Sequence, residues 1–282
     1  MKLVLVVSLG VALVASCPFG DEEIKAGKRL IKTSFEEPDF VGTFSSYFSR
    51  YYQSPNGTES QRWLLSQVQD SIANYVGNAT VNEVVHPFGV QNSIIARITG
   101  SDPTLRGEIV IIGAHQDSVN TFGALLAAPG GYIPKRTIEF HWYAAEEVGL
   151  RGSAAIAQIY NTNRVNVVGM VNFDVPGYHI AGRDEIGIYT DHVNAEVTTL
   201  LRLLVDGYCT YTWINKTCGY GCSDHASWTN YGFPAGFPAE TVFHPLMHRP
   251  GDNFESVGFT QVNEFVKLSL GFVVEMSEPG SL

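Results

Sequence analysis

Two adjacent carboxylates, Glu146 and Glu147, are the residues of this chain best placed to do chemistry. They follow an apolar run over 138–143 that is typical of a buried strand, and Gly149 with the small residues after it indicates a turn into a helix. The pair is therefore predicted at the carboxyl end of a strand, where open α/β sheets hold their active sites. Neighbouring side chains point in different directions there, so one carboxylate can bind a metal ion while the other remains a base. The alternative is a solvated acidic turn.

Two other predicted strands end in groups of the same kind. An apolar strand over 109–114 leads to His115, a candidate metal ligand, and Asp117 stands two residues later, where it can orient the imidazole. A third strand over 167–173 leads to Asp174. Acidic and imidazole groups are thus expected at the ends of three strands.

A second candidate imidazole, His248, lies near the C-terminus and is followed by Asp252. Two histidines with several carboxylates form a set of nitrogen and oxygen ligands. Such a set suits zinc better than copper or an iron–sulfur cluster. The residues therefore predict a zinc site at the end of the sheet.

Five segments resemble, in order along the chain, the motif set of secreted leucyl-aminopeptidase-type dizinc exopeptidases, metallopeptidase family 28. They are residues 113–118, 143–153, 172–174 and 218–228, and the single residue His248. The resemblance runs from about Phe35 to near the C-terminus, and five ordered motifs are far more specific than any one of them. It implies an α/β fold in a single domain, with a mixed, mostly parallel sheet flanked by helices on both faces.

The resemblance also implies a role for each matching residue. Four side chains would hold the two zinc ions of the family: His115 and Asp174 the first, Glu147 and His248 the second. Glu146 would be the general base, and Asp117 would support His115. These roles rest on the matching positions of the motifs.

The segment around Cys218 and Cys222 is expected to border the substrate pocket. The resemblance implies a disulfide between these two cysteines, although Cys-x-x-x-Cys can also be half of a zinc site. Tyr220, Phe237 and Met247 could line, with the disulfide, an apolar pocket for the first side chain of a peptide. Each of these three residues is equally explained as part of the core.

One departure from the family pattern concerns a bridging aspartate. In the family it lies in an Asp-rich segment just after an Ala-Pro-Gly, and that segment opens a helix. Here Ala128-Pro129-Gly130 runs directly into residues 131–136, and no aspartate occurs between Ser118 and Phe173. Such a clean loss between intact motifs is more typical of a skipped exon or a faulty gene model than of a gradual loss of function. We expect one zinc ion or none, and an inactive form of the enzyme is a consistent interpretation.

Composition and charge agree with a secreted domain. The net charge is −10 and no basic cluster occurs, which argues against a nucleic-acid partner. Residues 1–16 have one basic residue and an apolar stretch that ends in small residues, as a secretory signal peptide does. No other segment is long and apolar enough to span a membrane. Residues 17–35 form a short prelude or propeptide remnant, and residues 36–282 one zinc peptidase-like domain, expected to be monomeric.

Sequons and cysteines support the same compartment. Asn56, Asn78 and Asn215 each begin an Asn-x-Thr sequon, which favours a glycoprotein that is secreted without a lipid anchor. Cys17 and Cys209 have no assigned partner. A buried thiol at Cys209 and a second bridge are both consistent with the sequence.

The remaining pattern predicts the elements that position these residues. The strands over 109–114 and 138–143 are expected to be parallel neighbours, joined by a linker just long enough to cross back. Alternation near 81–86 and 93–99 predicts a hairpin that extends the sheet. Helices are expected over 36–52, 60–75, 122–128, 150–161, 193–206 and 260–276, and a helix containing a tryptophan after Ser223.

Several other polar residues are interpreted as structural. Arg50-Tyr51-Tyr52 resembles a family element but is interpreted as aromatic packing at a helix end. Asp224-His225 is expected to steady the pocket by hydrogen bonds. The remaining histidines are assigned to packing or to the surface: His86, His141, His179, His192 and His244.

The resemblance implies a zinc-dependent aminopeptidase that removes apolar, Leu-like residues from peptides with a free N-terminus. A secreted protein that binds peptides or a single zinc ion without catalysis is an alternative supported by the absent aspartate. A single-zinc cyclotransferase acting on N-terminal glutamine is another, but residues 143–153 and the cysteine segment match the peptidases better. Metal stoichiometry would separate the three.

Overall fold

The computed structural model describes residues 7–8, 38–47, 49–73, 75, 77–117, 126–127, 133–249 and 251–278. Apart from residues 7–8, the predicted signal peptide and the prelude over 17–35 lie outside this part of the chain. Ala128-Pro129-Gly130 lies outside it too, so the predicted loss of the Asp-rich segment falls beyond the described residues.

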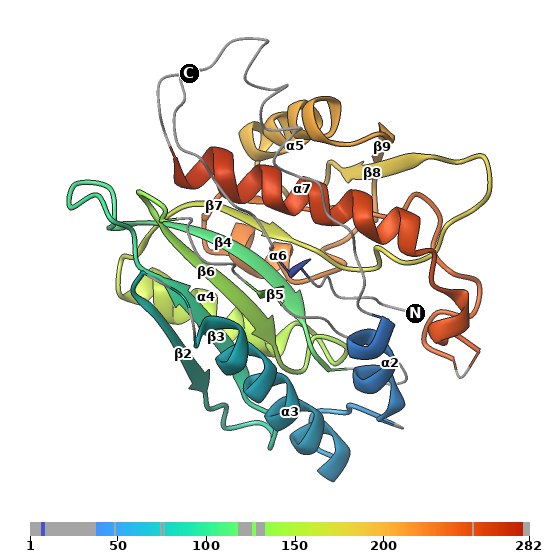
Figure 1. Ribbon diagram of the computed structural model, residues 1–282, viewed down its shortest axis with the longest axis horizontal. Helices are drawn as coiled ribbons and strands as arrows, with labels where there is room; N and C mark the ends of the chain where they lie inside the picture. Colours follow the sequence, from blue (N-terminus) through green and yellow to red (C-terminus); the bar gives the residue numbers. More distant parts are fainter. Residues whose placement is uncertain are drawn as a thin grey trace.

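A mixed sheet forms the centre of the molecule (Figure 1), with the strand order β10-β7-β4-β6-β3-β2. Its strands are β2 (Ala79–Val84), β3 (Ser93–Ile98), β4 (Glu108–His115), β6 (Thr137–Tyr143), β7 (Asn166–Asn172) and β10 (Ala235–Gly236). The strands from β10 to β6 run parallel, while β3 pairs antiparallel with both β6 and β2. The predicted fold class, the hairpin and the parallel pairing of β4 with β6 are confirmed.

Both faces of this sheet are apolar. Consecutive residues of its buried strands are mostly apolar, and successive side chains point to opposite faces. Val110, Ile112 and Ala114 of β4 join the larger core cluster, whereas Ile109 and Ile111 join the smaller one. A parallel sheet needs such cover on both faces. Helices supply it on each side.

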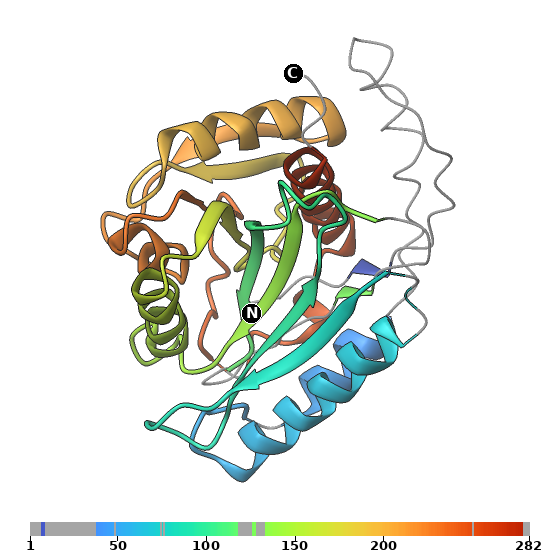
Figure 2. The same cartoon turned by 90° about the vertical axis from the view of Figure 1, so that its left-hand side faces the viewer.

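The helices lie in two layers about the sheet (Figure 2). They are α2 (Pro38–Ser46), α3 (Pro55–Ile72), α4 (Arg151–Thr162), α5 (Ala195–Tyr208), α6 (His225–Asn230) and α7 (Phe259–Ser277), with a short 3₁₀ turn η1 (Phe254–Ser256). Helices α2, α3 and α7 contribute Phe44, Leu64 and Phe265 to the larger cluster on one face. Helices α4 and α6 contribute Ile156 and Trp228 to the cluster on the other face.

Apart from the helix expected over 122–128, the helices expected from the sequence are present, and the bounds of the first two differ most from the expectation. Helix α2 ends at Ser46, before the expected residue 52. Helix α3 begins at Pro55 because Ser54 caps it: the Ser54 hydroxyl accepts a 2.9 Å hydrogen bond from the Gly57 amide. The start near residue 60 had been predicted from Thr58-Glu59-Ser60 as the helix entry, but the capping residue is Ser54, so the helix begins five residues earlier.

The helix expected over 122–128 is wrong where the structure describes it. Leu126–Ala127 is a strand, β5, which pairs in parallel with β1, Val7–Ser8. The backbone groups of these two residues bond to another segment and so cannot continue a helix. The other residues of the predicted range lie outside the described part.

A second, three-stranded sheet was not predicted from the sequence. It has the order β11-β8-β9, formed by Pro238–Ala239, Glu185–Tyr189 and Thr212–Lys216. Strand β9 carries polar residues at most positions and β11 has two residues, so neither gives a clear hydrophobic period. This sheet flanks the candidate substrate pocket described below.

Candidate metal and active site

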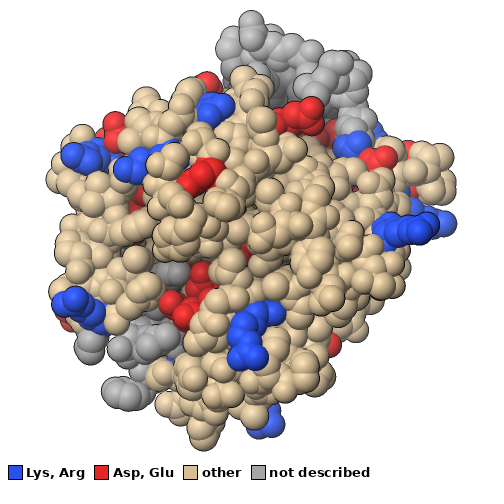
Figure 3. All heavy atoms as spheres, turned by 180° about the vertical axis from the view of Figure 1, so that it is seen from behind, with Lys and Arg blue, Asp and Glu red and all other residues tan. Residues whose placement is uncertain are grey.

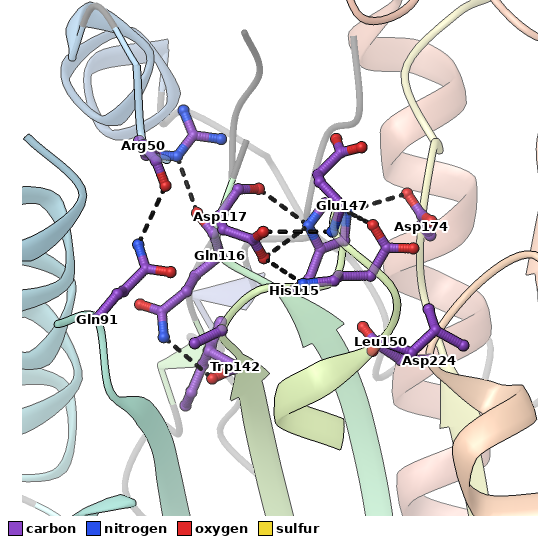
Figure 4. A network of polar contacts seen from close by, with 12 residues as sticks. Arg50, Gln91, His115, Gln116, Asp117, Trp142, Glu147, Leu150, Asp174 and Asp224 are labelled. Atoms are coloured by element: carbon purple, nitrogen blue, oxygen red, sulfur yellow. Dashed lines mark hydrogen bonds and ion pairs between the residues drawn. The ribbon is translucent and has the colours of Figure 1, made fainter. Parts of the chain in front are cut away.

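The sequence-predicted groups meet at the carboxyl ends of three neighbouring parallel strands (Figure 4). His115 ends β4 and lies opposite Tyr143 of β6 in the register, so the turn after β6 brings Glu146 and Glu147 to the imidazole. Asp174 follows β7 on the other side of β4. Strand order alone therefore gathers the imidazole and the three carboxylates.

The distances divide the candidate ligands into two pairs. His115 Nε2 lies 3.5 Å from Asp174 Oδ1, and His248 Nε2 lies 3.0 Å from Glu147 Oε2. These are the two pairs that the family resemblance implies. Glu146 stands between them: its Oε2 is 3.9 Å from His115 Nε2. His115, Glu146 and Glu147 each offer a ligand atom, and these atoms lie within 4.8 Å of one another.

Asp117 does more than support His115. Its two carboxylate oxygens accept hydrogen bonds from the amides of Glu146 (2.9 Å) and Glu147 (3.3 Å), and Oδ1 lies 3.5 Å from His115 Nδ1. The Asp117 carbonyl also lies 2.9 Å from His115 Nδ1, where it can accept a hydrogen bond from that nitrogen. One residue thus fixes the imidazole and the backbone of both glutamates.

Asp174 is held from the opposite side. The Ser223 hydroxyl donates to Asp174 Oδ2 at 2.7 Å, and Asn172 donates to the same hydroxyl at 2.8 Å. The other Asp174 oxygen, Oδ1, is the one nearest to His115. The carboxylate is therefore oriented before any cation binds.

The backbone is strained next to these groups. Ala145, Val175 and His248 have positive φ angles of 60°, 45° and 65°, and Leu150, which precedes α4, has 57°. Positive φ is costly for residues with a side chain, above all for a β-branched valine. Most of the non-glycine residues in this conformation within the described chain border the site. Strain of this kind is common where a chain must present functional groups.

Gly152 permits the close approach of α4 to the end of β6. Its amide donates to the Ala144 carbonyl at 2.9 Å, and an added Cβ would lie 2.3 Å from that oxygen. Only glycine fits such a contact. The turn that carries Glu146 and Glu147 is closed by this packing.

The site is electrostatically suited to a cation. Burial opposes the protonation of His115, but the carboxylates of Glu146, Asp117 and Asp174 raise its pKa well above the usual value. A field that favours a proton on this imidazole also favours a metal ion. His115 Nε2 is buried and makes no hydrogen bond within the described residues. The donor set therefore fits a zinc ion in both chemistry and position.

Acidic side chains also gather in a hollow on the face seen from behind in Figure 3, while lysine and arginine side chains are scattered over the rest of it. Negative charge in a concave surface concentrates cations and positively charged ligands.

Among the described residues, no helix is both long and apolar enough to cross a membrane.

Arg50 is a site residue that the sequence interpretation missed. It lies outside α2, is fully buried, and donates from Nε to the Gln116 carbonyl at 3.0 Å (Figure 4). Burial lowers its pKa to about 9, while Asp117 and Glu147 oppose that shift. Aromatic packing, which was predicted for this segment, holds for Tyr52, whose ring lies 6.2 Å from that of Phe88. The resemblance of Arg50-Tyr51-Tyr52 to a family element was the feature of the sequence that could have identified Arg50 as a site residue.

The candidate substrate pocket is partly assembled. Cys218 and Cys222 form the predicted disulfide, and Met247 packs with them in one apolar cluster that contains Phe237. Tyr220 is 66% exposed at the rim of the cysteine loop and is not part of this cluster. Phe237 is fully buried, so it supports the cluster from within.

Within the described part of the chain, the hydrogen bonds that were expected of Asp224 and His225 are found only for Asp224, and His225 contacts the pocket residue Phe237 through its ring. Asp224 accepts a hydrogen bond from Ser153, and the His225 ring stacks on Phe237 with centroids 4.4 Å apart. Burial and the charge of Glu146 raise the pKa of Asp224 well above its usual value. Burial lowers the pKa of His225 to about 3, so this imidazole stays neutral.

Other contacts account for the histidines assigned to packing or the surface. His86 bonds to Ser93, His141 to Glu139 and His179 to Asp184, His244 lies 3.5 Å from Asp252, and His192 is exposed. Cys209 is a half-buried free thiol, so among the described residues the second bridge does not form, and burial raises the pKa of this thiol to about 12. The sequon residues Asn78 and Asn215 are exposed and Asn56 is half-buried, while Cys17 lies outside the described residues.

The sequence of this chain was compared with protein families and with known proteins. Residues 124–273 match the family model described as Peptidase family M28. Leucine aminopeptidase 1 of Ajellomyces capsulatus is 35% identical over 274 residues, which cover 84% of this chain and 70% of that protein. This chain belongs to peptidase family M28. Its M28 match begins after His115 and Asp117, so these two candidate residues precede the matched range.

Three further proteins are similar to this chain in sequence or in fold. Leucine aminopeptidase 1 of Arthroderma otae is 39% identical over 273 residues, covering 83% of this chain and 71% of that protein. The LapA aminopeptidase of Legionella pneumophila superposes with a TM-score of 0.80 at 26% identity, covering 94% of this chain and 78% of that chain. The predicted zinc exopeptidase-like fold is thereby confirmed. The glutaminyl cyclase of Fimbriiglobus ruber, with a TM-score of 0.64 at 13% identity, shares the fold alone.

Proposed function

We propose that this protein is a secreted, zinc-dependent aminopeptidase that removes apolar, Leu-like residues from the free N-terminus of peptides. The observation that carries the proposal is the meeting of His115, Glu146, Glu147 and Asp174 at adjoining strand ends, opposite His248. The leucine aminopeptidases among its relatives support the same substrate class. The leader over 1–16 and the sequons support secretion.

His115 with Asp174, and Glu147 with His248, would hold zinc. When bound, zinc polarises a peptide carbonyl and lowers the pKa of a water molecule that it coordinates. Glu146 is the general base: it takes the proton of the attacking water and passes it to the leaving amine. Its amide is fixed by Asp117, so the carboxylate has a defined direction.

Substrate binding uses the acidic surroundings and the pocket. The carboxylates of the site attract the positively charged α-amino group, which favours cleavage of the first residue. The cluster of Phe237, Met247 and the Cys218–Cys222 disulfide offers apolar surface to the first side chain. We infer that Tyr220 covers this pocket from its exposed rim position.

The absent Asp-rich segment sets the number of zinc ions. A bridging carboxylate offsets the repulsion between two close cations, so a chain that lacks one is expected to bind a single zinc ion with reduced affinity. The second candidate function, a secreted protein that binds peptides or one zinc ion without catalysis, rests on this feature of the sequence. The chain as given is then nearly inactive on leucine amides.

One experiment separates the two functions. The parent chain is compared with a variant that carries the family's Asp-containing segment and helix between Gly130 and Gly131. We expect the graft to raise zinc content from one to two ions, to restore hydrolysis of leucine p-nitroanilide, and to increase thermal stability. A graft that binds two zinc ions and remains inactive would favour the binding protein. A parent with two zinc ions and full activity would refute the role of the missing segment.

A further inference from the structure

Glu240 links the two segments that carry the candidate ligands Asp174 and His248. It follows β11 and its side chain is fully buried. Glu240 Oε2 accepts a hydrogen bond from the Tyr178 amide at 2.7 Å, and Oε1 accepts one from the His244 amide at 3.3 Å. One carboxyl group thus bonds to a backbone amide four residues after Asp174 and to another four residues before His248.

The segment after Asp174 is fixed at several further points. The Glu240 amide donates to the Val175 carbonyl at 3.2 Å, where the backbone has its positive φ angle. The Gln261 side chain of α7 donates to the Tyr178 carbonyl at 2.9 Å. Asp174 therefore leads into a stretch whose course is set by Glu240 on one side and by α7 on the other.

The loop that carries His248 begins at the residue that Glu240 holds. The His244 carbonyl accepts from the Met247 amide at 2.9 Å, and His244 Nδ1 accepts from the Leu246 amide at 3.2 Å. The Tyr178 ring also meets the His244 ring edge-on, with centroids 4.6 Å apart. His248 itself is 43% exposed, so its position depends on the turn that starts at His244.

A carboxyl group at this depth is not explained by stability. Burying one costs free energy, and an apolar side chain would fill the same space without that cost. Asp174 lies close enough for its charge to oppose a second negative charge on Glu240. The carboxyl group accepts hydrogen bonds from two separate segments, at Tyr178 and at His244, which an apolar side chain cannot do.

We propose that Glu240 is a positioning residue that sets the separation between the two pairs of candidate ligands, His115 with Asp174 and Glu147 with His248. The inference rests on the proposed metal site and adds a residue to it that coordinates nothing. Residues that orient ligands from behind typically change metal affinity about 10- to 100-fold when replaced.

The first test compares Glu240→Ala with a matched control, Glu264→Ala. Glu264 is also a buried carboxylate that accepts a backbone amide, from Thr210 at 2.6 Å, but it joins α7 to the end of α5. Zinc affinity is measured by competition with a chromophoric chelator, and ligand geometry by the visible spectrum of the cobalt-substituted protein. Glu240→Ala is expected to lose zinc affinity about 10- to 100-fold and to shift the cobalt spectrum. Glu264→Ala is expected to keep both.

Glu240→Gln guards against a variant that does not fold. Its amide oxygen can keep the shorter bond to Tyr178, while its NH₂ group faces the His244 amide, so an intermediate loss of affinity is expected. Hydrogen exchange in the metal-free protein gives a second readout. The amides of Tyr178 and His244 should both exchange faster in Glu240→Ala than in the parent, whereas in Glu240→Gln only the His244 amide should do so.

The outcomes separate the inference from the proposed function. Parent affinity and an unchanged cobalt spectrum in Glu240→Ala would overturn the positioning role while leaving the zinc site intact. Unchanged exchange at Tyr178 and His244 would overturn it as well, whatever the metal results. A parent chain that takes up no zinc would overturn the proposed function, and this role of Glu240 with it.

Discussion

Strand β6 carries two buried polar clusters that differ in how they are satisfied. Along the strand, Glu139, His141 and Tyr143 form a network closed by protein partners: Glu139 accepts from Tyr160 at 2.6 Å and bonds to His141 at 2.9 Å. Tyr143 in turn accepts from the Trp228 indole at 2.9 Å. At the end of the same strand, Glu146 and Glu147 meet His115, whose buried Nε2 has no hydrogen bond within the described residues.

The backbone shows the same contrast. The network lies on a regular strand paired on both sides, whereas Ala145 and Leu150 of the site have positive φ angles. A network closed by protein partners makes a core specific and rigid. The second cluster places several carboxylates side by side on a strained backbone, and their mutual repulsion is offset only when a positive charge binds among them. The second cluster is therefore suited to bind a cation.

The largest expected effect is on peptidase activity, which should depend on the strand-end cluster and not on the closed network. In the graft that restores hydrolysis, Glu146→Gln should lower kcat on leucine p-nitroanilide by about 10²- to 10⁴-fold at unchanged zinc content, because a base is needed for turnover and not for coordination. Glu139→Gln, a carboxylate lost from the closed network, is the control and should keep most of the activity per folded molecule. Retained activity in Glu146→Gln would reject this residue as the base.

Metal content gives the next contrast. In the graft, which is expected to hold two zinc ions, His248→Ala removes a candidate ligand of one of them, and we expect the affinity for that ion to fall about 100-fold or more. The control is His141→Ala, which removes the same kind of side chain from the closed network and should leave zinc affinity unchanged. Equilibrium dialysis with metal analysis measures both. Equal zinc affinities in the two variants would show that the site has been assigned to the wrong histidine.

Much of this contrast was predictable from the sequence, and the limits have physical causes. The apolar runs before His115, Glu146 and Asp174 specify strands, and strands of one parallel sheet bring their ends together. Glu240 could not be found in this way, because its role depends on a turn between β11 and His248 that has no periodic pattern. Glu139 and His141 were rightly placed inside a strand, but their hydrogen-bond partners, which include Tyr160 of α4, could not be predicted because that contact depends on the packing of α4 against the sheet.

Stability should respond most to the closed network. Glu139→Ala leaves the His141 imidazole and the Tyr160 hydroxyl without the carboxylate that they share, and an unsatisfied buried polar group costs about 1–3 kcal/mol. The ion pair with Arg97, whose side chain is 37% exposed, adds little. Urea unfolding of the metal-free protein measures this loss of unfolding free energy. A change below about 1 kcal/mol, the size expected at an exposed pair, would mean that the network does not stabilise the core.

A smaller effect is expected from His86, which bonds to Ser93 at 2.7 Å beside the start of the site turn. Burial lowers the pKa of His86 to about 4, so below about pH 6.5 the unfolded chain binds a proton that the folded chain does not. The free energy of unfolding should therefore fall as the pH falls from about 6.5 to about 4. In His86→Phe this fall should be smaller by on the order of 2 kcal/mol, as urea unfolding at several pH values would show. An identical pH profile would remove His86 from the account.

The zinc stoichiometry of the parent chain tests the central claim most directly. Native mass spectrometry after dialysis against zinc counts the ions that each folded chain holds. We expect one zinc ion per chain, lost in Asp174→Ala, because the strand-end cluster binds a cation while its bridging segment is absent. No zinc in the parent would contradict the assignment of the cluster as a metal site, and two zinc ions would contradict the role given to the missing segment.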